Sequence, residues 1–251
     1  MIWVGTSWKM TGTRASAREY CDTLARADPD GWRGIQPFVV PPFTLIAQVH
    51  DALGAGSPFL VGAQDAHWAP PGAWTGEVSV PQVADAGAVL VELGHSERRA
   101  HLGETDERVN LKVEAVLAAG LRPLVCVGDS AQELASGRSA DVVSAQIDAA
   151  LAGVATPERV LVAYEPVWAI GECGRPPAPG EIEQVVDRLA RRFGDSVQAI
   201  LYGGSVGPDN AADLLRVPGV GGLFVGRAAW RAEGYLDLLR RCGTVVAENQ
   251  G

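Results

Sequence analysis

Residues 160–171 read VLVAYEPVWAIG, and their order of apolar and polar side chains decides the fold prediction. Residues 160–163 are apolar throughout, which is typical of a strand buried on both faces of a parallel sheet. Glu165 comes directly before Pro166, whose ring keeps the preceding residue extended. The stretch therefore predicts a carboxylate at the carboxyl end of a buried strand, followed by an apolar loop suited to covering a site. Taken alone, Glu165 would be read as a surface acid paired with a cation, and only the polar residues after the other strands change that interpretation.

Short apolar runs like this one recur along the chain and alternate with helix-like stretches. The strand candidates are 2–5, 37–40, 59–62, 89–93, 123–127, 160–163, 199–201 and 223–225. The helix candidates include 16–27, 44–53, 106–119, 139–152, 179–193 and 210–215, with Gly or Pro near their ends. Eight β/α units at nearly even spacing favour an α/β fold, a closed (β/α)8 barrel, over an open sheet. No linker interrupts the pattern, so we expect residues 1–251 to form a single domain.

Composition narrows the class of protein. The chain is 47% hydrophobic and 20% charged, and no apolar run is long enough to span a bilayer, so we expect no membrane partner. Its net charge of −9 argues against nucleic-acid binding, which needs a basic footprint. The amino-terminal residues lack the features of a secretory signal, which favours a cytoplasmic location. The cysteines show no CxxC spacing and are expected to be free thiols; they are Cys21, Cys126, Cys173 and Cys242.

Polar residues that follow the strand candidates are the candidate site residues, because barrels of this kind carry their active sites at the carboxyl ends of the strands. Lys9, in GTSWKM (5–10), needs a carboxylate or an anion nearby, although its ammonium group could also reach solvent at the rim. His95, in VELGHSERR (91–99), opens a predicted helix. The helix dipole there disfavours imidazolium, so a neutral hydrogen-bond donor is expected, although a lone histidine is often only structural.

Three glycine-containing loops complete the candidate list. YGGSV (202–206) and GLFVGR (222–227) follow the last two strands, where backbone N–H groups commonly bind phosphate. Plain tight turns are the alternative for both. GAWTGE (72–77) follows the third strand and suits either an ordinary surface loop or a loop that inserts into a neighbouring subunit.

The motifs WKM (8–10), GHSERR (94–99), AYEPVWAIG (163–171) and YGGSV (202–206) occur in this order over essentially the whole chain, which resembles the triosephosphate isomerase family. The resemblance implies a TIM barrel in which Glu165 moves a proton between adjacent carbons. It implies that neutral His95 polarises the carbonyl group, that Lys9 stabilises the negative charge and that Glu97 supports them. No metal and no organic cofactor is implied.

The resemblance also assigns the phosphate site and the lid. Backbone N–H groups of Gly171, Ser205 and Gly226 would hold the phosphate of a small phosphorylated sugar. Residues 166–171 would begin a lid over it, and Tyr202 would latch that lid when it is closed.

A homodimer is implied as well. Thr75 resembles the residue that reaches the partner's active site, and Glu77 and Arg98 resemble the pair that ties the subunits together.

Several positions depart from the family pattern close to the substrate. Ser7 stands where the family usually has asparagine, which frees room beside the lysine. Arg227 replaces the second of two glycines at the phosphate, and Trp74 replaces a smaller aromatic residue. The lid after Gly171 reads ECGRPPAP where the family usually has a TGK tip.

These departures suggest the same reaction on a different substrate. GTSWKM, AHW (66–68), GAWTGE, VELGHSERR and VGRAAW (225–230) resemble the branch that converts L-erythrulose 1-phosphate to D-erythrulose 4-phosphate. The alternative is triosephosphate isomerase proper, acting on dihydroxyacetone phosphate in glycolysis. A more remote one is a phosphosugar-binding barrel without turnover.

Overall fold

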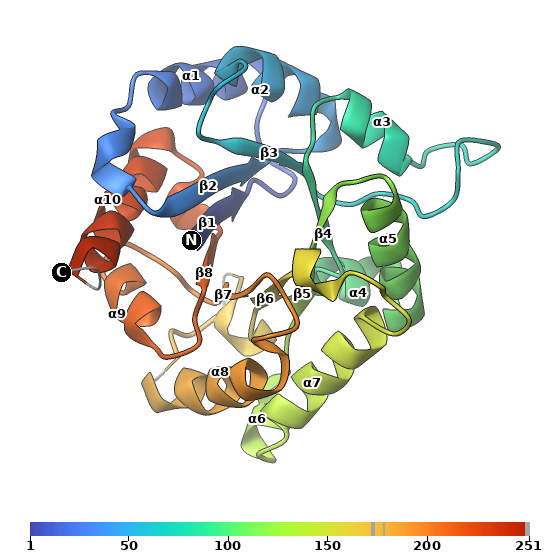
Figure 1. Ribbon diagram of the computed structural model, residues 1–251, viewed down its shortest axis with the longest axis vertical. Helices are drawn as coiled ribbons and strands as arrows, with labels where there is room; N and C mark the ends of the chain where they lie inside the picture. The colour runs from blue at the N-terminus through green and yellow to red at the C-terminus, as the bar shows by residue number, and fades with distance from the viewer. Residues whose placement is uncertain (172–173, 178, 249–251) are drawn as a thin grey trace.

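The computed structural model describes residues 1–171, 174–177 and 179–248, and its centre is a closed ring of eight parallel strands (Figure 1). The ring closes because β1 pairs with both β2 and β8. Each strand lies within two residues of its predicted bounds at each end, so the predicted (β/α)8 barrel is confirmed. The strands are β1 (Ile2–Ser7), β2 (Ile35–Val40), β3 (Leu60–Ala63), β4 (Leu90–Leu93), β5 (Arg122–Val127), β6 (Leu161–Tyr164), β7 (Ala199–Tyr202) and β8 (Gly222–Val225).

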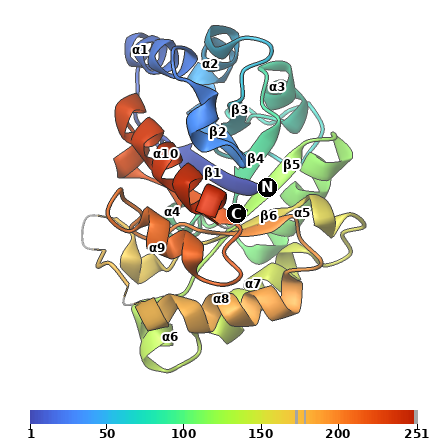
Figure 2. The same ribbon diagram turned by 60° about the vertical axis from the view of Figure 1, so that its left-hand side comes forward.

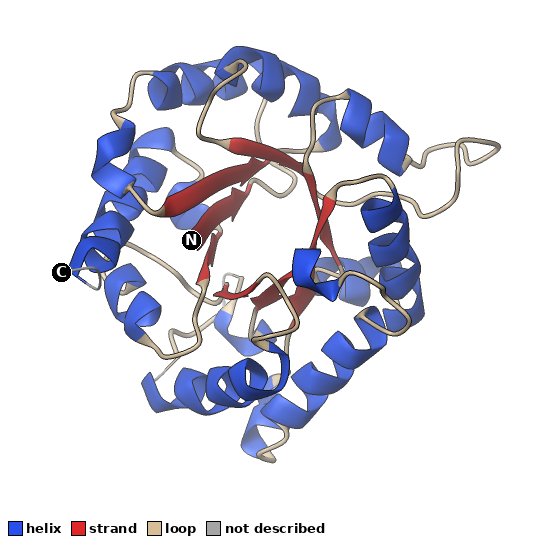
Figure 3. Ribbon diagram, viewed as in Figure 1, coloured by secondary structure: helices blue, strands red, loops and turns tan. Residues whose placement is uncertain are grey.

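Helices form a layer around this ring (Figure 3). In both ribbon views α1 and α2 lie at the top and α7 and α8 at the bottom, with the barrel between them (Figure 2). The α-helices are α1 (Arg14–Ala25), α2 (Ile46–Leu53), α3 (Val80–Asp85), α4 (Ser96–Leu102), α5 (Asp106–Ala118), α6 (Ala131–Ala135), α7 (Ser139–Ala150), α8 (Pro179–Phe193), α9 (Ala211–Arg216) and α10 (Ala232–Glu248). Short 3-10 helices occupy Pro29–Trp32, Phe43–Leu45, Pro157–Arg159, Val167–Ala169 and Arg227–Ala229.

The helix predictions differ from the structure mainly at the ends. The stretch predicted as one helix over 44–53 begins as the 3-10 helix Phe43–Leu45 and becomes α-helical only at Ile46. The helix α10 was not among the named candidates, although its side chains bury an apolar face against the barrel. Within the described part of the chain, none of the helices combines the length and the apolar character that a bilayer crossing needs.

Side-chain alternation along the strands decides which residues reach the centre of the barrel. On β6, Leu161 and Ala163 belong to the cluster inside the ring, whereas Val162 and Tyr164 pack outward against the helices. Because successive side chains in a strand point to opposite faces, the next inward position after Ala163 is Glu165. The predicted carboxylate therefore lies at the top of the barrel interior, 6% exposed.

Candidate active site

Glu165 and His95 meet at the mouth of the barrel. The carboxylate oxygen Oε2 of Glu165 lies 3.5 Å from Nε2 of His95, and both side chains are buried. The backbone N–H of Glu165 donates to the Val127 carbonyl at 2.8 Å, which fixes the start of the loop after β6. No described residue hydrogen-bonds Oε2. A buried, unpartnered carboxylate oxygen beside an imidazole is suited to accept a proton.

The protonation of His95 follows from its hydrogen bonds. His95 caps α4, and its Nδ1 accepts the backbone N–H of Glu97 at 3.1 Å. A ring nitrogen that accepts a hydrogen bond carries no proton, so the imidazole is neutral and its proton is on Nε2. The positive end of the α4 dipole favours the same state. His95 thus presents an N–H donor to the space it shares with Glu165.

Lys9 lies beside His95, because both side chains contact the carboxylate of Glu97. Its Nζ donates to Oε1 of Glu97 at 2.6 Å. Burial raises the pKa of Glu97, but the hydrogen bond from Lys9 and the nearby positive charges together outweigh burial, and the net pKa is lowered. Lys9 has a positive φ of 52°, a conformation that costs energy in a residue with a side chain. The Gln64 amide donates to the Lys9 carbonyl at 2.9 Å and so supports this turn.

Asp129 fixes the lid-side end of β6 and was missed by sequence reasoning. It is fully buried, and its carboxylate accepts from Tyr164 Oη at 2.9 Å and from Trp168 Nε1 at 3.1 Å. Ser139 Oγ donates to it at 2.6 Å. Tyr164 and Trp168 flank Glu165 in the chain, so Asp129 restrains the segment on both sides of that carboxylate. Its position just after β5 could have marked Asp129 as a candidate site residue. Its hydrogen-bond partners, however, lie on other segments of the chain.

The turn after β7 approaches Glu165 closely. A Cβ atom built on Gly203 would lie 2.7 Å from Cγ of Glu165, so only glycine fits beside the carboxylate. The hydroxyl of Tyr202 is buried and has no hydrogen-bond partner among the described residues.

The residues expected to hold phosphate lie on turns that contact the beginning of the lid. Ser205, with a φ of 50°, donates its hydroxyl to the Ala169 carbonyl. The Arg227 guanidinium donates to the Gly171 carbonyl at 2.9 Å. Gly226 follows the last residue of β8 and precedes the short helix that starts at Arg227. The structure thus brings the turns after β6, β7 and β8 together, whereas Cys173 and the rest of 172–173 and 178 lie outside the described residues.

Ser7 and Glu92 form a second polar pair inside the barrel, and sequence reasoning assigned Glu92 no role. Ser7 Oγ donates to Oε2 of Glu92 at 2.8 Å, and both side chains are buried. The pKa of Glu92 is raised to about 7, mainly by burial and also by the nearby Glu165, although His95, the Ser7 hydrogen bond and Lys9 act in the opposite direction.

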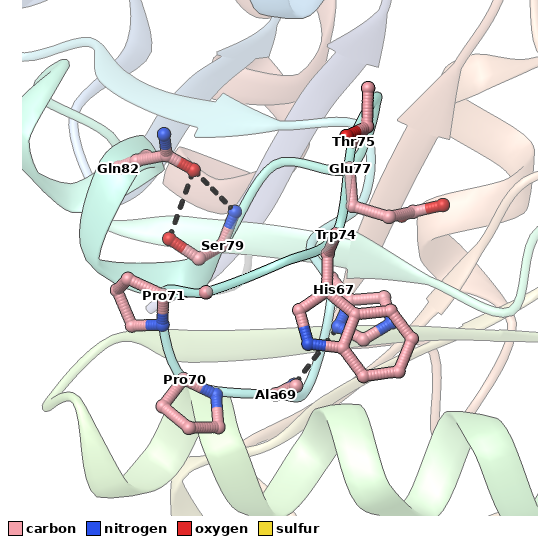
Figure 4. A pocket seen from close by; sticks show the side chains of 10 residues that line it. His67, Ala69, Pro70, Pro71, Trp74, Thr75, Glu77, Ser79 and Gln82 are labelled. Atoms are coloured by element: carbon pink, nitrogen blue, oxygen red, sulfur yellow. Dashed lines mark hydrogen bonds between the residues drawn. The ribbon is translucent and has the colours of Figure 1, made fainter.

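The loop that bears Thr75 and Glu77 joins β3 to α3 and projects from the barrel (Figure 1). Both residues line a hollow of about 330 Å³ formed by this loop (Figure 4). The rings of Trp74 and His67 pack against each other there, with centroids 4.5 Å apart, and Trp74 is 51% exposed.

Arg98 is held within its own chain. Its guanidinium contacts Asp65 at 2.5 Å and Glu104 at 3.2 Å, and its side chain remains 28% exposed. Lys112 binds both of these acids and is itself buried. Sequence reasoning paired Arg98 only with Glu77 and missed this network.

Comparisons with known proteins agree with the geometry. The family model of triosephosphate isomerase matches residues 2–242. A protein of Mycolicibacterium smegmatis named L-erythrulose-1-phosphate isomerase is 52% identical, over 95% of this chain and 92% of its own length. A protein of the same name from Mesorhizobium japonicum is 48% identical, over 98% and 99%. The crystal structure of triosephosphate isomerase from Bartonella henselae superimposes with a TM-score of 0.84 at 33% identity, covering 96% of this chain and 98% of that one. The chain belongs to the triosephosphate isomerase family.

Proposed function

We propose that this protein is an isomerase that interconverts L-erythrulose 1-phosphate and D-erythrulose 4-phosphate. The observation that carries the isomerase chemistry is the buried, unpartnered Glu165 oxygen 3.5 Å from the proton-bearing nitrogen of neutral His95. The four-carbon substrate is supported by the relatives of that name, which are about half identical over nearly the whole chain. No cofactor is needed, because these side chains supply both a base and hydrogen-bond donors.

The first step is removal of a proton from carbon 3 of L-erythrulose 1-phosphate. Glu165 takes the proton, the electron pair of the C–H bond forms a double bond between carbons 2 and 3, and the carbonyl oxygen on carbon 2 becomes an oxyanion. The His95 N–H and the Lys9 ammonium stabilise that oxyanion. Donors held in place stabilise a developing negative charge more strongly where water is excluded. Glu97 orients the ammonium through its hydrogen bond.

The second step returns the proton to the other carbon of the enediolate, carbon 2. His95 protonates the oxygen on carbon 2 and recovers a proton from the hydroxyl on carbon 3. Glu165 then delivers its proton to carbon 2, and the carbonyl group re-forms at carbon 3. The product carries its phosphate next to the new secondary alcohol, which makes it D-erythrulose 4-phosphate.

The phosphate is bound by backbone N–H groups of Gly171, Ser205 and Gly226, with the guanidinium of Arg227 beside them. Arg227 already contacts the lid at the Gly171 carbonyl. Closing the apolar lid over the phosphate would exclude water, which otherwise protonates the enediolate or allows loss of phosphate.

Substrate choice is tested by comparing kcat/KM for L-erythrulose 1-phosphate and dihydroxyacetone phosphate. We expect a preference of tenfold or more for the four-carbon ketose, because the short Ser7 side chain leaves room beside Lys9. A preference of at least tenfold for dihydroxyacetone phosphate would identify a triosephosphate isomerase proper. Absence of proton exchange with solvent from either bound ketose phosphate would instead favour a binding barrel without turnover.

We also propose a homodimer in which Thr75 approaches the partner's active site and Glu77 of one subunit pairs with Arg98 of the other. The projecting loop, its exposed Trp74 and the remaining exposure of Arg98 support this arrangement.

Light scattering should give twice the chain mass of 26.3 kDa for the wild type. Thr75→Arg adds a long cation at the interface and should shift the mass towards the monomer while lowering kcat/KM about tenfold. Thr244→Arg, an exposed change on α10, serves as control. A Thr75→Arg variant that stays dimeric and fully active contradicts the proposed interface.

We also propose a cytoplasmic location, because the cysteines that the structure describes as free form no disulfide bonds. Cys21, Cys126 and Cys242 are buried free thiols, which suits a reducing compartment.

A further inference from the structure

Glu92 is a buried carboxylic acid that the proposed mechanism does not use. It lies on β4, three positions before His95, and is 2% exposed. Leu90 belongs to the cluster inside the barrel, whereas Val91 and Leu93 pack outward. By the same alternation Glu92 points into the barrel, one layer below the mouth.

The surroundings of Glu92 identify it as part of the site's inner wall. Among the described residues its hydrogen-bond partner is Ser7, on the far side of the barrel interior, and its Oε1 has no such partner. His95, Glu165 and Lys9 are all close enough to influence its pKa. Burying an ionisable group without full pairing costs stability, and an apolar side chain would fill the position at lower cost. A costly acid beside reacting groups points to a role in function.

The position of Glu92 relative to the phosphate defines what part of a substrate it meets. The phosphate ligands proposed above lie on the turns after β6, β7 and β8. In a closed ring of eight strands, β4 lies directly across from β8. A ligand with its phosphate at those turns and its reacting carbons between Glu165 and His95 therefore points its other end towards β4.

That other end is where the two candidate substrates differ. L-erythrulose 1-phosphate carries a hydroxymethyl group on the carbon that loses its proton, whereas dihydroxyacetone phosphate has only hydrogen there. The hydroxymethyl group brings one hydroxyl, which can donate to a carboxyl oxygen. Ser7 provides the room for the extra carbon, and its hydrogen bond to Oε2 leaves Oε1 for the ligand.

We infer that Glu92, oriented by Ser7, binds the terminal hydroxyl of the four-carbon ketose phosphate and sets the preference for it over the three-carbon substrate. The inference rests on the proposed function, because it names the subsite of that same substrate. Ser7 acts on it as a positioning residue.

The test measures the ratio of kcat/KM for L-erythrulose 1-phosphate to kcat/KM for dihydroxyacetone phosphate. Glu92→Val removes the acceptor and should lower this ratio by about 10- to 100-fold, the usual effect of losing a hydrogen bond to a charged group. Glu92→Gln keeps an acceptor oxygen of the same reach and should retain most of the preference. Leu90→Val, a smaller change at the next inward position of the same strand, controls for altered barrel packing and should leave the ratio unchanged.

A second measurement, the binding of unreactive analogues, gives a result even for a variant that has lost turnover. 2-Phosphoglycolate has a phosphate and a carboxylate but no terminal hydroxymethyl group, so its inhibition constant or dissociation constant should change less than threefold in Glu92→Val. Erythritol 4-phosphate, a four-carbon analogue that keeps the terminal hydroxymethyl group, should bind at least tenfold more weakly to the same variant.

The outcomes separate the two proposals. A wild-type enzyme that prefers dihydroxyacetone phosphate overturns both the proposed function and the role of Glu92. A wild type that prefers L-erythrulose 1-phosphate, with the ratio unchanged in Glu92→Val, overturns only the role of Glu92. A Glu92→Val variant that loses kcat equally on both substrates also overturns it, because Glu92 would then act on the reacting atoms.

Discussion

Replacing Glu165 with glutamine is expected to lower kcat on L-erythrulose 1-phosphate by about 10³-fold or more, near the upper part of the range for a general base. The amide has nearly the same shape as the carboxylate but cannot accept the proton from carbon 3. Because the Glu165 backbone is held by Val127 and its neighbours by Asp129, the geometry of the site should be preserved. Steady-state kinetics, with proton exchange into solvent measured on the same substrate, checks the result.

The matched control is Glu19→Gln, an identical chemical change at an exposed position on α1. It should leave kcat, KM and the melting temperature unchanged. The Glu165→Gln variant should be no less stable than the wild type, because it removes a buried charge whose Oε2 has no partner among the described residues. Activity of Glu165→Gln within tenfold of the wild type would show that another group removes the proton.

The barrel could be predicted from the sequence because its strands are short apolar runs at regular intervals. The same pattern predicted Glu165 at a strand end, and alternation beyond Ala163 accounts for its inward direction. Lys9 and His95 were predicted as site residues for the same reason, because both are polar residues that come just after strands.

The polar contacts between distant segments could not be predicted in this way. Glu92 lies within the strand candidate 89–93. Because that strand has apolar side chains on both faces, its sequence pattern does not show which residues point into the barrel. Its partner Ser7 is 85 positions away in the sequence. The hydrogen bonds of Asp129 come from Tyr164, at the end of β6, and from Trp168, in the loop after β6, and not from the loop that bears Asp129. Such pairs are set by the closure of the barrel, and local sequence patterns carry no information about them.

Lys9→Met is expected to lower kcat/KM by about 10²- to 10³-fold, the usual cost of removing one preorganised donor from a developing oxyanion. Methionine has a similar length but no charge, so the enediolate oxygen would keep only the His95 N–H. The stability should change little, because the Lys9–Glu97 pair is partly exposed, with 26% and 51% of the two side chains accessible. Kinetics and thermal unfolding on the same sample measure both effects.

The chain supplies a matched control, because it contains only two lysines, Lys9 and Lys112. Lys112 is buried with Asp65 and Glu104, and Lys112→Met would leave those two carboxylates without its charge. Breaking a buried pair in this way costs about 3–5 kcal/mol of unfolding free energy. Lys112→Met should therefore lower the melting temperature while the folded enzyme keeps its kcat, and Lys9→Met should do the reverse. If Lys9→Met kept its activity, the role assigned to Lys9 in stabilising the oxyanion would be wrong.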